Sequence, residues 1–190
     1  SDLYTKFELI KKLYKEADEV LNYPISKLIL NGPKEELDLT ENTQPAIFLV
    51  GYSIFQILKE EFNIDLNKAK FFAGHSLGEY TALACAGALD FPSTLKILKL
   101  RGRAMQTAVP KGEGGMLAIL GSDIDTIEKN FEENKSQFKC FIANDNSNGQ
   151  IVASGTMENI NKLSKDLTSK NIKNIKLSVS AQFHCNLMNK

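Results

Sequence analysis

The chain has 190 residues, and its 23 Lys and Arg residues balance 23 Asp and Glu residues. A formal net charge of zero argues against a nucleic-acid-binding protein, because such proteins usually carry a basic excess. No run of about 18 apolar residues occurs, so no membrane span is predicted. Three cysteines without CxxC spacing, and two histidines at no ligand spacing from them, indicate reduced thiols and predict no metal site.

The first part of the chain predicts helices. Apolar residues at three- and four-residue steps indicate an amphipathic helix from Leu3 to Leu21. A short apolar stretch, residues 25–30, ends at the helix-stop signal Asn31-Gly32-Pro33. Thr43 is the expected N-cap of a long helix that reaches Phe62. We expect burial along an apolar stripe of this helix, which consists of Ile47, Val50, Ile54, Ile57 and Leu58.

A strand–turn–helix unit follows. The run from Lys70 to Gly74 is aromatic, short and ends in glycine, which predicts a buried strand. Small residues from Tyr80 to Ala88 predict a helix, and Asp90 is the expected cap of another that runs to about Ala108. This order favours an α/β layered architecture.

The pattern beyond Lys111 predicts a separate subdomain. Strands are expected over residues 116–120, 138–143, 150–154 and 172–179, and helices over 123–134 and 157–169. Asn148-Gly149 is a typical hairpin turn. The order βαββαβ is that of a ferredoxin-like unit. We therefore predict a small subdomain over residues 112–180, inserted in a large domain that consists of residues 1–111 and 181–190.

The sequence Gly74-His75-Ser76-Leu77-Gly78 matches the G-x-S-x-G nucleophile elbow, with a predicted strand before it and a helix after it. The tight turn predicts that side chains at Gly74 and Gly78 would collide with backbone. The N-terminus of the following helix would favour negative charge near Ser76 Oγ, and the Leu77 N–H is a natural oxyanion donor.

A serine hydroxyl needs a general base, and the chain offers two histidines. His75 adjoins Ser76 on the sharp turn, so its side chain should diverge from Oγ. His184 lies where the chain should return from the subdomain, and we predict that it is the base. A solvated or structural role is the alternative for a lone histidine.

Arg101 lies within the apolar stripe of its helix, whereas Arg103 is expected at the surface. A buried guanidinium needs an anionic partner. Spacing alone leaves two candidates open, an internal carboxylate such as Glu79 and a carboxylate of the substrate.

Charge is unevenly distributed in the predicted subdomain. Acidic residues dominate positions 123–134, and six lysines occur after residue 158: Lys162, Lys165, Lys170, Lys173, Lys176 and Lys190. This lysine patch could steer an acidic partner, and a plain solvated face is the alternative.

Three motifs in order resemble the malonyl-CoA:acyl carrier protein transacylase family. They are residues 74–80 (GHSLGEY), residues 101–106 (RGRAMQ) and residues 179–185 (VSAQFHC), with further likeness at residues 42–46 and 112–116. The resemblance implies an α/β hydrolase-like large domain that carries the ferredoxin-like subdomain. It implies no cofactor, and a location in the cytoplasm or in an organelle of bacterial descent.

The resemblance also implies the reaction. Ser76 would take malonyl from malonyl-CoA, His184 would act as base and then acid, and the Leu77 N–H would belong to the oxyanion hole. Arg101 would pair with the free malonyl carboxylate. The malonyl group would then pass to the phosphopantetheine thiol of acyl carrier protein, in fatty acid biosynthesis.

Two family segments have no match here, an N-terminal Gly-Gln-Gly loop and the region after the catalytic histidine. We therefore expect the chain to be truncated relative to the family. Two alternatives remain. One is a serine thioesterase or hydrolase with Asp145 or Asp166 as its acid, and the other is a carrier-protein-binding fragment without activity.

Overall fold

The computed structural model describes residues 2–108 and 112–177. The chain divides into two compact units, residues 1–103 and 104–190, and each is described by itself. The boundary falls within one helix, α7 (Phe91–Ala108). Among the described residues, no helix is long and apolar enough to cross a membrane.

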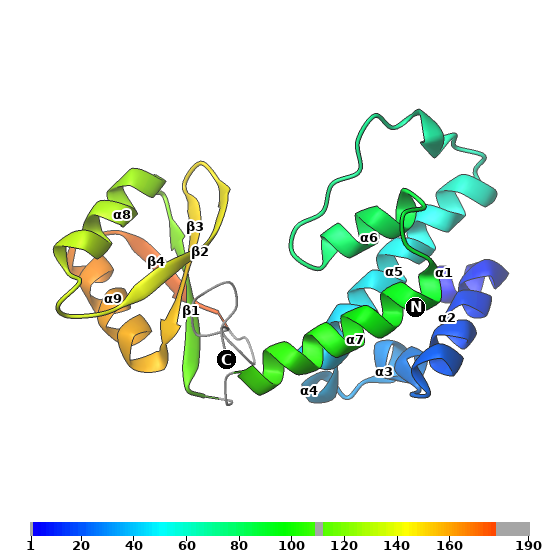
Figure 1. The fold of residues 1–190 in the computed structure, drawn as a ribbon, viewed down its shortest axis with the longest axis horizontal. Coiled ribbons are helices and arrows are strands. Elements are labelled where there is room, and N and C mark those ends of the chain that lie inside the picture. The colour runs from blue at the N-terminus through cyan, green and yellow to red at the C-terminus, as the bar shows by residue number, and fades with distance from the viewer. Residues whose placement is uncertain (1, 109–111, 178–190) are drawn as a thin grey trace. The chain divides into compact units, whose positions relative to one another are not determined.

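Unit 1 is built from helices (Figure 1). These are α1 (Asp2–Lys6), α2 (Glu8–Leu21), α3 (Ile25–Asn31), α4 (Lys34–Leu37), α5 (Thr40–Glu60), the 3₁₀ turn η1 (Leu66–Lys68), α6 (Gly78–Cys85) and most of α7. The core lies where α2, α3, α5 and α7 meet, and it includes Ile10, Ile25, Phe48, Leu49 and Leu95. The ring of Phe91 stacks 5.0 Å from that of Tyr52, which joins the start of α7 to α5.

Two expectations for unit 1 need correction. The first helix is interrupted at Phe7, whose backbone is extended. The long helix begins at Thr40, three residues before the predicted cap; Thr43 lies inside α5 and its hydroxyl donates to the Leu37 carbonyl. Pro45 therefore lies beyond the first turn, where it cannot donate to the Glu41 carbonyl.

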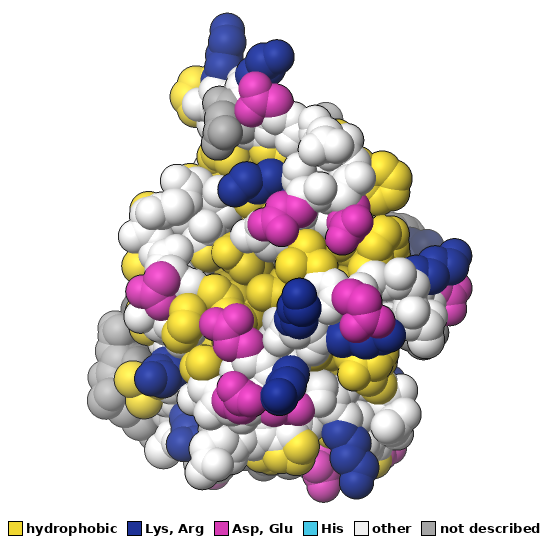
Figure 2. All heavy atoms as spheres, turned by 90° about the vertical axis from the view of Figure 1, so that its right-hand side faces the viewer, with side chains coloured by type: hydrophobic (Ala, Val, Ile, Leu, Met, Phe, Trp, Pro, Cys, Tyr) yellow, Lys and Arg dark blue, Asp and Glu magenta, His cyan; other side chains and the backbone are white. Residues whose placement is uncertain are grey.

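The buried face of α5 also differs from the predicted stripe. Phe48, Leu49 and Ile57 are buried, but Ile47 is 52% exposed, and Val50 and Ile54 are also exposed. The described elements pack against the Phe48 side, so only that side of the helix is covered. Figure 2 likewise shows hydrophobic side chains gathered on the face that it draws, with lysines and carboxylates around them.

The predicted strand at residues 70–74 is not formed. Phe71 is 88% exposed and the segment has no regular structure. A strand needs a partner for its backbone hydrogen bonds. Every strand among the described residues lies in unit 2, so this segment has none to pair with in unit 1.

Unit 2 has the predicted element order. The strands are β1 (Gly114–Leu120), β2 (Cys140–Ser147), β3 (Gln150–Thr156) and β4 (Lys173–Lys176), and the helices are α8 (Ile124–Glu133) and α9 (Met157–Ser169). The antiparallel sheet has the order β2-β3-β1-β4. Leu117 and Ile119 of β1 share one core with Ile127 of α8 and Leu163 of α9, so both helices pack on the same face.

Local side-chain and turn contacts shape unit 2. Asp123 caps α8, since its side chain accepts a hydrogen bond from the Thr126 amide at 2.7 Å. Gly149 adopts a φ of 80° in the β2–β3 turn, which glycine tolerates without strain. The predicted end of the last strand and the return of the chain at residue 181 lie outside the described residues.

Candidate active site

Ser76 lies in a sharp turn directly before α6. Its φ is +55°, a left-handed conformation that non-glycine residues rarely adopt. Such backbone strain is concentrated at functional sites. A Cβ added at Gly74 would lie 1.9 Å from the Gly78 carbonyl oxygen, so only glycine fits there. The turn therefore has the tight geometry predicted for a nucleophile elbow.

The prediction for Gly78 is wrong. A Cβ at this position would meet nothing within 4 Å, because Gly78 is the first residue of α6 and its side-chain position faces open space. Leu77 is the N-cap residue. The amides of Gly78 and Glu79 bond back to the His75 and Ser76 carbonyls, while the Leu77 amide donates to no backbone carbonyl of the described residues.

Arg101 reaches Ser76 from α7. Its Nη2 donates to Ser76 Oγ at 3.2 Å and its Nη1 donates to Gln44 Oε1 at 2.5 Å. Its Cζ lies 5.7 Å from the centroid of the Tyr80 ring, a cation–π distance. Within residues 2–108 and 112–177 no carboxylate pairs with this guanidinium, so Glu79 is not its partner. The half-buried positive charge faces the serine hydroxyl.

A close crossing of α5 and α7 holds Arg101 in place. A Cβ at Gly102 would lie 2.5 Å from Glu41 Cα, so the two backbones touch there. Lys99 Nζ donates to Asn42 Oδ1 at 2.7 Å and lies 3.2 Å from Glu41 Oε2, which also accepts from Arg103 Nε at 2.8 Å. The hydrogen bond from Arg103, with that from Lys99, lowers the pKa of Glu41. The carboxylate therefore stays ionised at neutral pH and joins both cations.

The other predicted site residues lie elsewhere. His75 is exposed next to the turn. His184, the predicted base, lies outside the described residues. Burial raises the pKa of the Cys85 thiol to about 11 and that of Cys140 to about 12, so both are protonated at neutral pH. In the described ranges, no group of three or more His, Cys, Asp or Glu residues could hold a metal ion.

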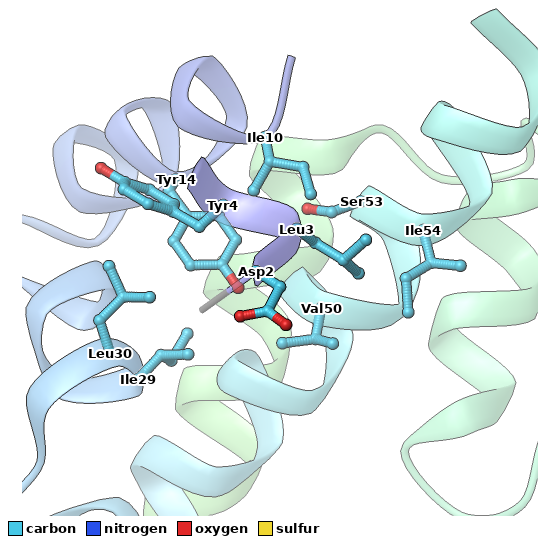
Figure 3. A pocket seen from close by; sticks show the side chains of 10 residues that line it. All are labelled: Asp2, Leu3, Tyr4, Ile10, Tyr14, Ile29, Leu30, Val50, Ser53 and Ile54. Atoms are coloured by element: carbon cyan, nitrogen blue, oxygen red, sulfur yellow. The ribbon is translucent and has the colours of Figure 1, made fainter. Parts of the chain in front are cut away.

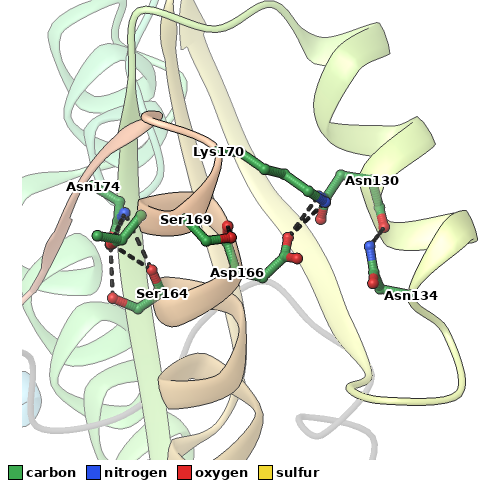
Figure 4. Close-up of polar contacts among 8 residues, drawn as sticks. Asn130, Asn134, Ser164, Asp166, Ser169, Lys170 and Asn174 are labelled. Atoms are coloured by element: carbon green, nitrogen blue, oxygen red, sulfur yellow. Dashed lines mark hydrogen bonds and ion pairs between the residues drawn. The ribbon is translucent and has the colours of Figure 1, made fainter.

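The two acids considered for a thioesterase belong to unit 2. Asp166 accepts hydrogen bonds from Asn130 Nδ2 at 2.7 Å and from Lys170 Nζ at 2.9 Å, in the network of Figure 4. The bond from Asn130 ties α8 to α9, whereas Lys170 is the C-cap residue of α9 itself. Asp145 is exposed on β2. Asp166 is thus already engaged in a structural role.

The lysine patch is partly neutralised. Lys162 pairs with Glu158 at 2.7 Å, Lys170 pairs with Asp166, and Lys176 donates to Asn161 at 2.6 Å. Lys165 and Lys173 are exposed, and Lys190 lies outside the described residues.

A pocket of about 550 Å³ opens between α1, α2, α3 and α5 (Figure 3). Its wall is mostly apolar, with Asp2, Tyr4 and Ser53 contributing polar atoms. Ser76 and Arg101 do not line it. The pocket is therefore separate from the serine site.

Three residues at the serine site were not assigned a role from the sequence. Gln44 is 57 positions from its partner Arg101, and no short-range pattern joins them. Tyr80 lies four residues after Ser76, where the helix geometry of α6 could have placed it near the elbow. Gly102 inside a helix is a signal for close packing, since glycine there otherwise costs stability.

The comparisons with known proteins agree on one family. Residues 1–190 match the acyl transferase domain family. The malonyl CoA-acyl carrier protein transacylase of Haemophilus influenzae is 39% identical over 99% of this chain, and that of Bacillus subtilis is 40% identical over 98%. The chain spans 60% and 58% of the length of these two relatives.

Solved structures give the same result. The acyl-carrier-protein S-malonyltransferase of Bartonella henselae is 38% identical with a TM-score of 0.91, over 98% of this chain and 60% of that one. A complex of a type II polyketide synthase acyl-carrier protein with its malonyl-transacylase matches with the same TM-score, at 37% identity, over 98% of this chain and 60% of that chain. With the family match over its whole length, the chain belongs to the acyl transferase domain family.

Proposed function

We propose that this chain carries the acyl-accepting part of a malonyl-CoA:acyl carrier protein transacylase. The single observation that carries the proposal is the guanidinium of Arg101, which lies 3.2 Å from Ser76 Oγ and has no carboxylate partner in the described part of the chain. The names of the relatives support the same reaction.

The proposed first half-reaction forms an ester on Ser76. Oγ attacks the thioester carbonyl of malonyl-CoA, and its proton passes to His184. The Leu77 N–H, at the N-terminal end of α6, donates to the oxyanion. Collapse of the tetrahedral intermediate breaks the carbon–sulfur bond, and coenzyme A leaves as a thiol with the proton from His184.

Arg101 selects the acyl group. In a malonyl ester one methylene separates the carbonyl from the free carboxylate, so this carboxylate must lie close to Oγ. The Arg101 guanidinium lies 3.2 Å from Oγ and can exchange its bond to Ser76 for a bond to the carboxylate. An acetyl ester has no free carboxylate, so it offers the guanidinium no anionic partner and is disfavoured.

The second half-reaction regenerates Ser76. The phosphopantetheine thiol of acyl carrier protein attacks the ester carbonyl, and its proton passes to His184. Collapse of this tetrahedral intermediate breaks the bond between the carbonyl carbon and Oγ, and His184 returns the proton to Oγ. Lys165 and Lys173 could attract an acidic carrier protein. Binding of carrier protein should then weaken as salt rises, and salt-independent binding would exclude this role for the lysines.

The fold expectations belong to the same proposal. The large domain, residues 1–111 and 181–190, would be α/β hydrolase-like and carry the small subdomain of residues 112–180. The strained Ser76 turn before α6 supports this assignment. The reaction would take place in the cytoplasm or in an organelle of bacterial descent.

Intact-mass spectrometry after mixing with malonyl-CoA tests the proposal. The expected result is a malonyl adduct on the unmodified chain that is absent from Ser76→Ala. Arg101→Ala should lose malonyl transfer far more than acetyl transfer. No adduct on the unmodified chain would support an inert fragment, and consumption of malonyl-CoA at the same rate with and without carrier protein would support a hydrolase.

A further inference from the structure

We propose that Gln44 is a positioning residue that holds the Arg101 guanidinium toward Ser76 and thereby sets the preference for an acyl group with a free carboxylate. This inference rests on the proposed function and assigns a role to a residue that acts through its bond to Arg101. It follows from three properties of the α5–α7 crossing.

The first property is the geometry of the bonds. The guanidinium is planar, and its two terminal nitrogens donate to two different acceptors, Gln44 Oε1 at 2.5 Å and Ser76 Oγ at 3.2 Å. The bond to Gln44 is the shorter one, and it does not involve Ser76, so acylation of Ser76 leaves its two partners unchanged. Gln44 therefore keeps the plane of the guanidinium fixed while Nη2 changes its acceptor.

The second property is the chemistry of the acceptor. Gln44 is 3% exposed, so water has little access to replace Arg101 as a donor to its amide oxygen. An amide oxygen is neutral, so it orients the guanidinium without cancelling its charge. A carboxylate at this position would form an ion pair and compete with the malonyl carboxylate.

The third property is the rigidity of the support. Gln44 and Arg101 lie on helices whose backbones touch at Gly102, and Glu41 accepts from both Lys99 and Arg103 beside them. These contacts fix the spacing of α5 and α7 independently of Arg101. The short bond from Arg101 to Gln44 thus belongs to a fixed crossing, so it can hold the guanidinium in one orientation.

The test compares Gln44→Met and Gln44→Glu with a matched control, Lys99→Met. The control removes the hydrogen bond of Lys99 to Asn42 and the ion pair of Lys99 with Glu41. It leaves Gln44, the Gly102 contact and the bond from Arg103 to Glu41 in place, so the crossing keeps its support. The first measurement is the ratio of malonyl to acetyl adduct on the 190-residue chain by intact mass. We expect Gln44→Met to lower this ratio by about tenfold or more, since a bond to a charged donor is lost. Gln44→Glu should also lower it, because the charge is cancelled.

The second measurement is the nitrogen NMR signal of the Arg101 guanidinium, assigned with Arg101→Lys. Rotation about Cζ–Nε should be slow in the unmodified chain and in Lys99→Met, which gives separate signals for Nη1 and Nη2. In Gln44→Met the two signals should merge. A loss of stability alone would not produce this difference between the two variants.

The two measurements separate the possible failures. If the unmodified chain accepts neither acyl group, the proposed function fails for this chain, and the NMR comparison still decides whether Gln44 holds Arg101. If Gln44→Met keeps both the adduct ratio and the separate signals, the positioning role is refuted. A ratio that falls equally in Lys99→Met would likewise contradict a specific role for Gln44.

Discussion

Replacement of Gly102 by alanine tests the α5–α7 crossing that supports the serine site. The new Cβ would lie 2.5 Å from Glu41 Cα and 2.6 Å from the Thr40 carbonyl oxygen. Both are backbone atoms, so no side chain can rotate to make room. Restoring ordinary contact, at 3.4 Å or more, requires the two backbones to separate by about 0.9 Å.

The expected cost follows from this displacement. A shift of that size would stretch the 2.5 Å bond from Arg101 to Gln44 to about 3.4 Å, near the limit of a hydrogen bond. Overpacking costs about 1–3 kcal/mol, and a lost bond to a charged donor about 1.5–3 kcal/mol. Alanine in place of glycine stabilises a helix by about 0.5–1 kcal/mol. We therefore expect unit 1 to lose about 2–5 kcal/mol of unfolding free energy.

Gly51→Ala is the matched control. Gly51 also lies in a helix, α5, but a Cβ there would lie 3.5 Å from Thr81 Cγ2, an ordinary contact with a side-chain end. This variant should gain about 0.5–1 kcal/mol from helix propensity. The two substitutions are chemically identical, so they should shift stability in opposite directions because of packing alone.

Urea unfolding followed by tyrosine fluorescence measures both variants. The chain has no tryptophan, and all five tyrosines lie in unit 1, so the signal reports this unit. A Gly102→Ala transition at the same or higher urea concentration than that of Gly51→Ala would refute the close crossing. An unchanged Arg101 guanidinium signal in Gly102→Ala would refute its link to the site.

Three further predictions concern other parts of the chain. Gly74→Ala should abolish acylation of Ser76 by displacing backbone, while Gly78→Ala should preserve the turn; intact-mass spectrometry distinguishes them, and equal loss in both would contradict the described geometry. The amide hydrogen bond to Asp123 lowers its pKa, so its stabilising effect is present above the ordinary pKa of about 3.9 and is lost as pH falls through the lower folded pKa. In chemical unfolding, Asp123→Ala should therefore be less stable than the unmodified chain at neutral pH, and this difference should shrink in acid. A difference independent of pH would exclude stabilisation by the ionised cap. Leu163→Ala removes a fully buried side chain and should cost about 2–5 kcal/mol in unfolding monitored by circular dichroism, whereas Ile175→Ala, at a half-exposed position, should cost much less; equal costs would disprove the assigned core.

Short-range patterns made much of the fold predictable from the sequence. The element order of unit 2 follows from hydrophobic periodicity, and the cap at Asp90 follows from a side chain that accepts from the amide three residues ahead. The glycine spacing around Ser76 predicted a tight turn, since the Gly74 position excludes a side chain. Each of these features depends on residues close together in the chain.

Tertiary structure decided the features that depend on distant segments. The sequence predicted a charged partner for Arg101 without identifying it, and the α5–α7 crossing supplies the neutral amide of Gln44, 57 residues away. The exposed side of α5 and the unpaired segment at Phe71 show the same limit of sequence-based prediction. The spacing of hydrophobic residues reveals an apolar face but not which element covers it. The sequence by itself thus determined the chemical groups and the turn that presents Ser76. Only packing decided which groups meet, since helix contacts are set by backbone approach and side-chain shape across the fold.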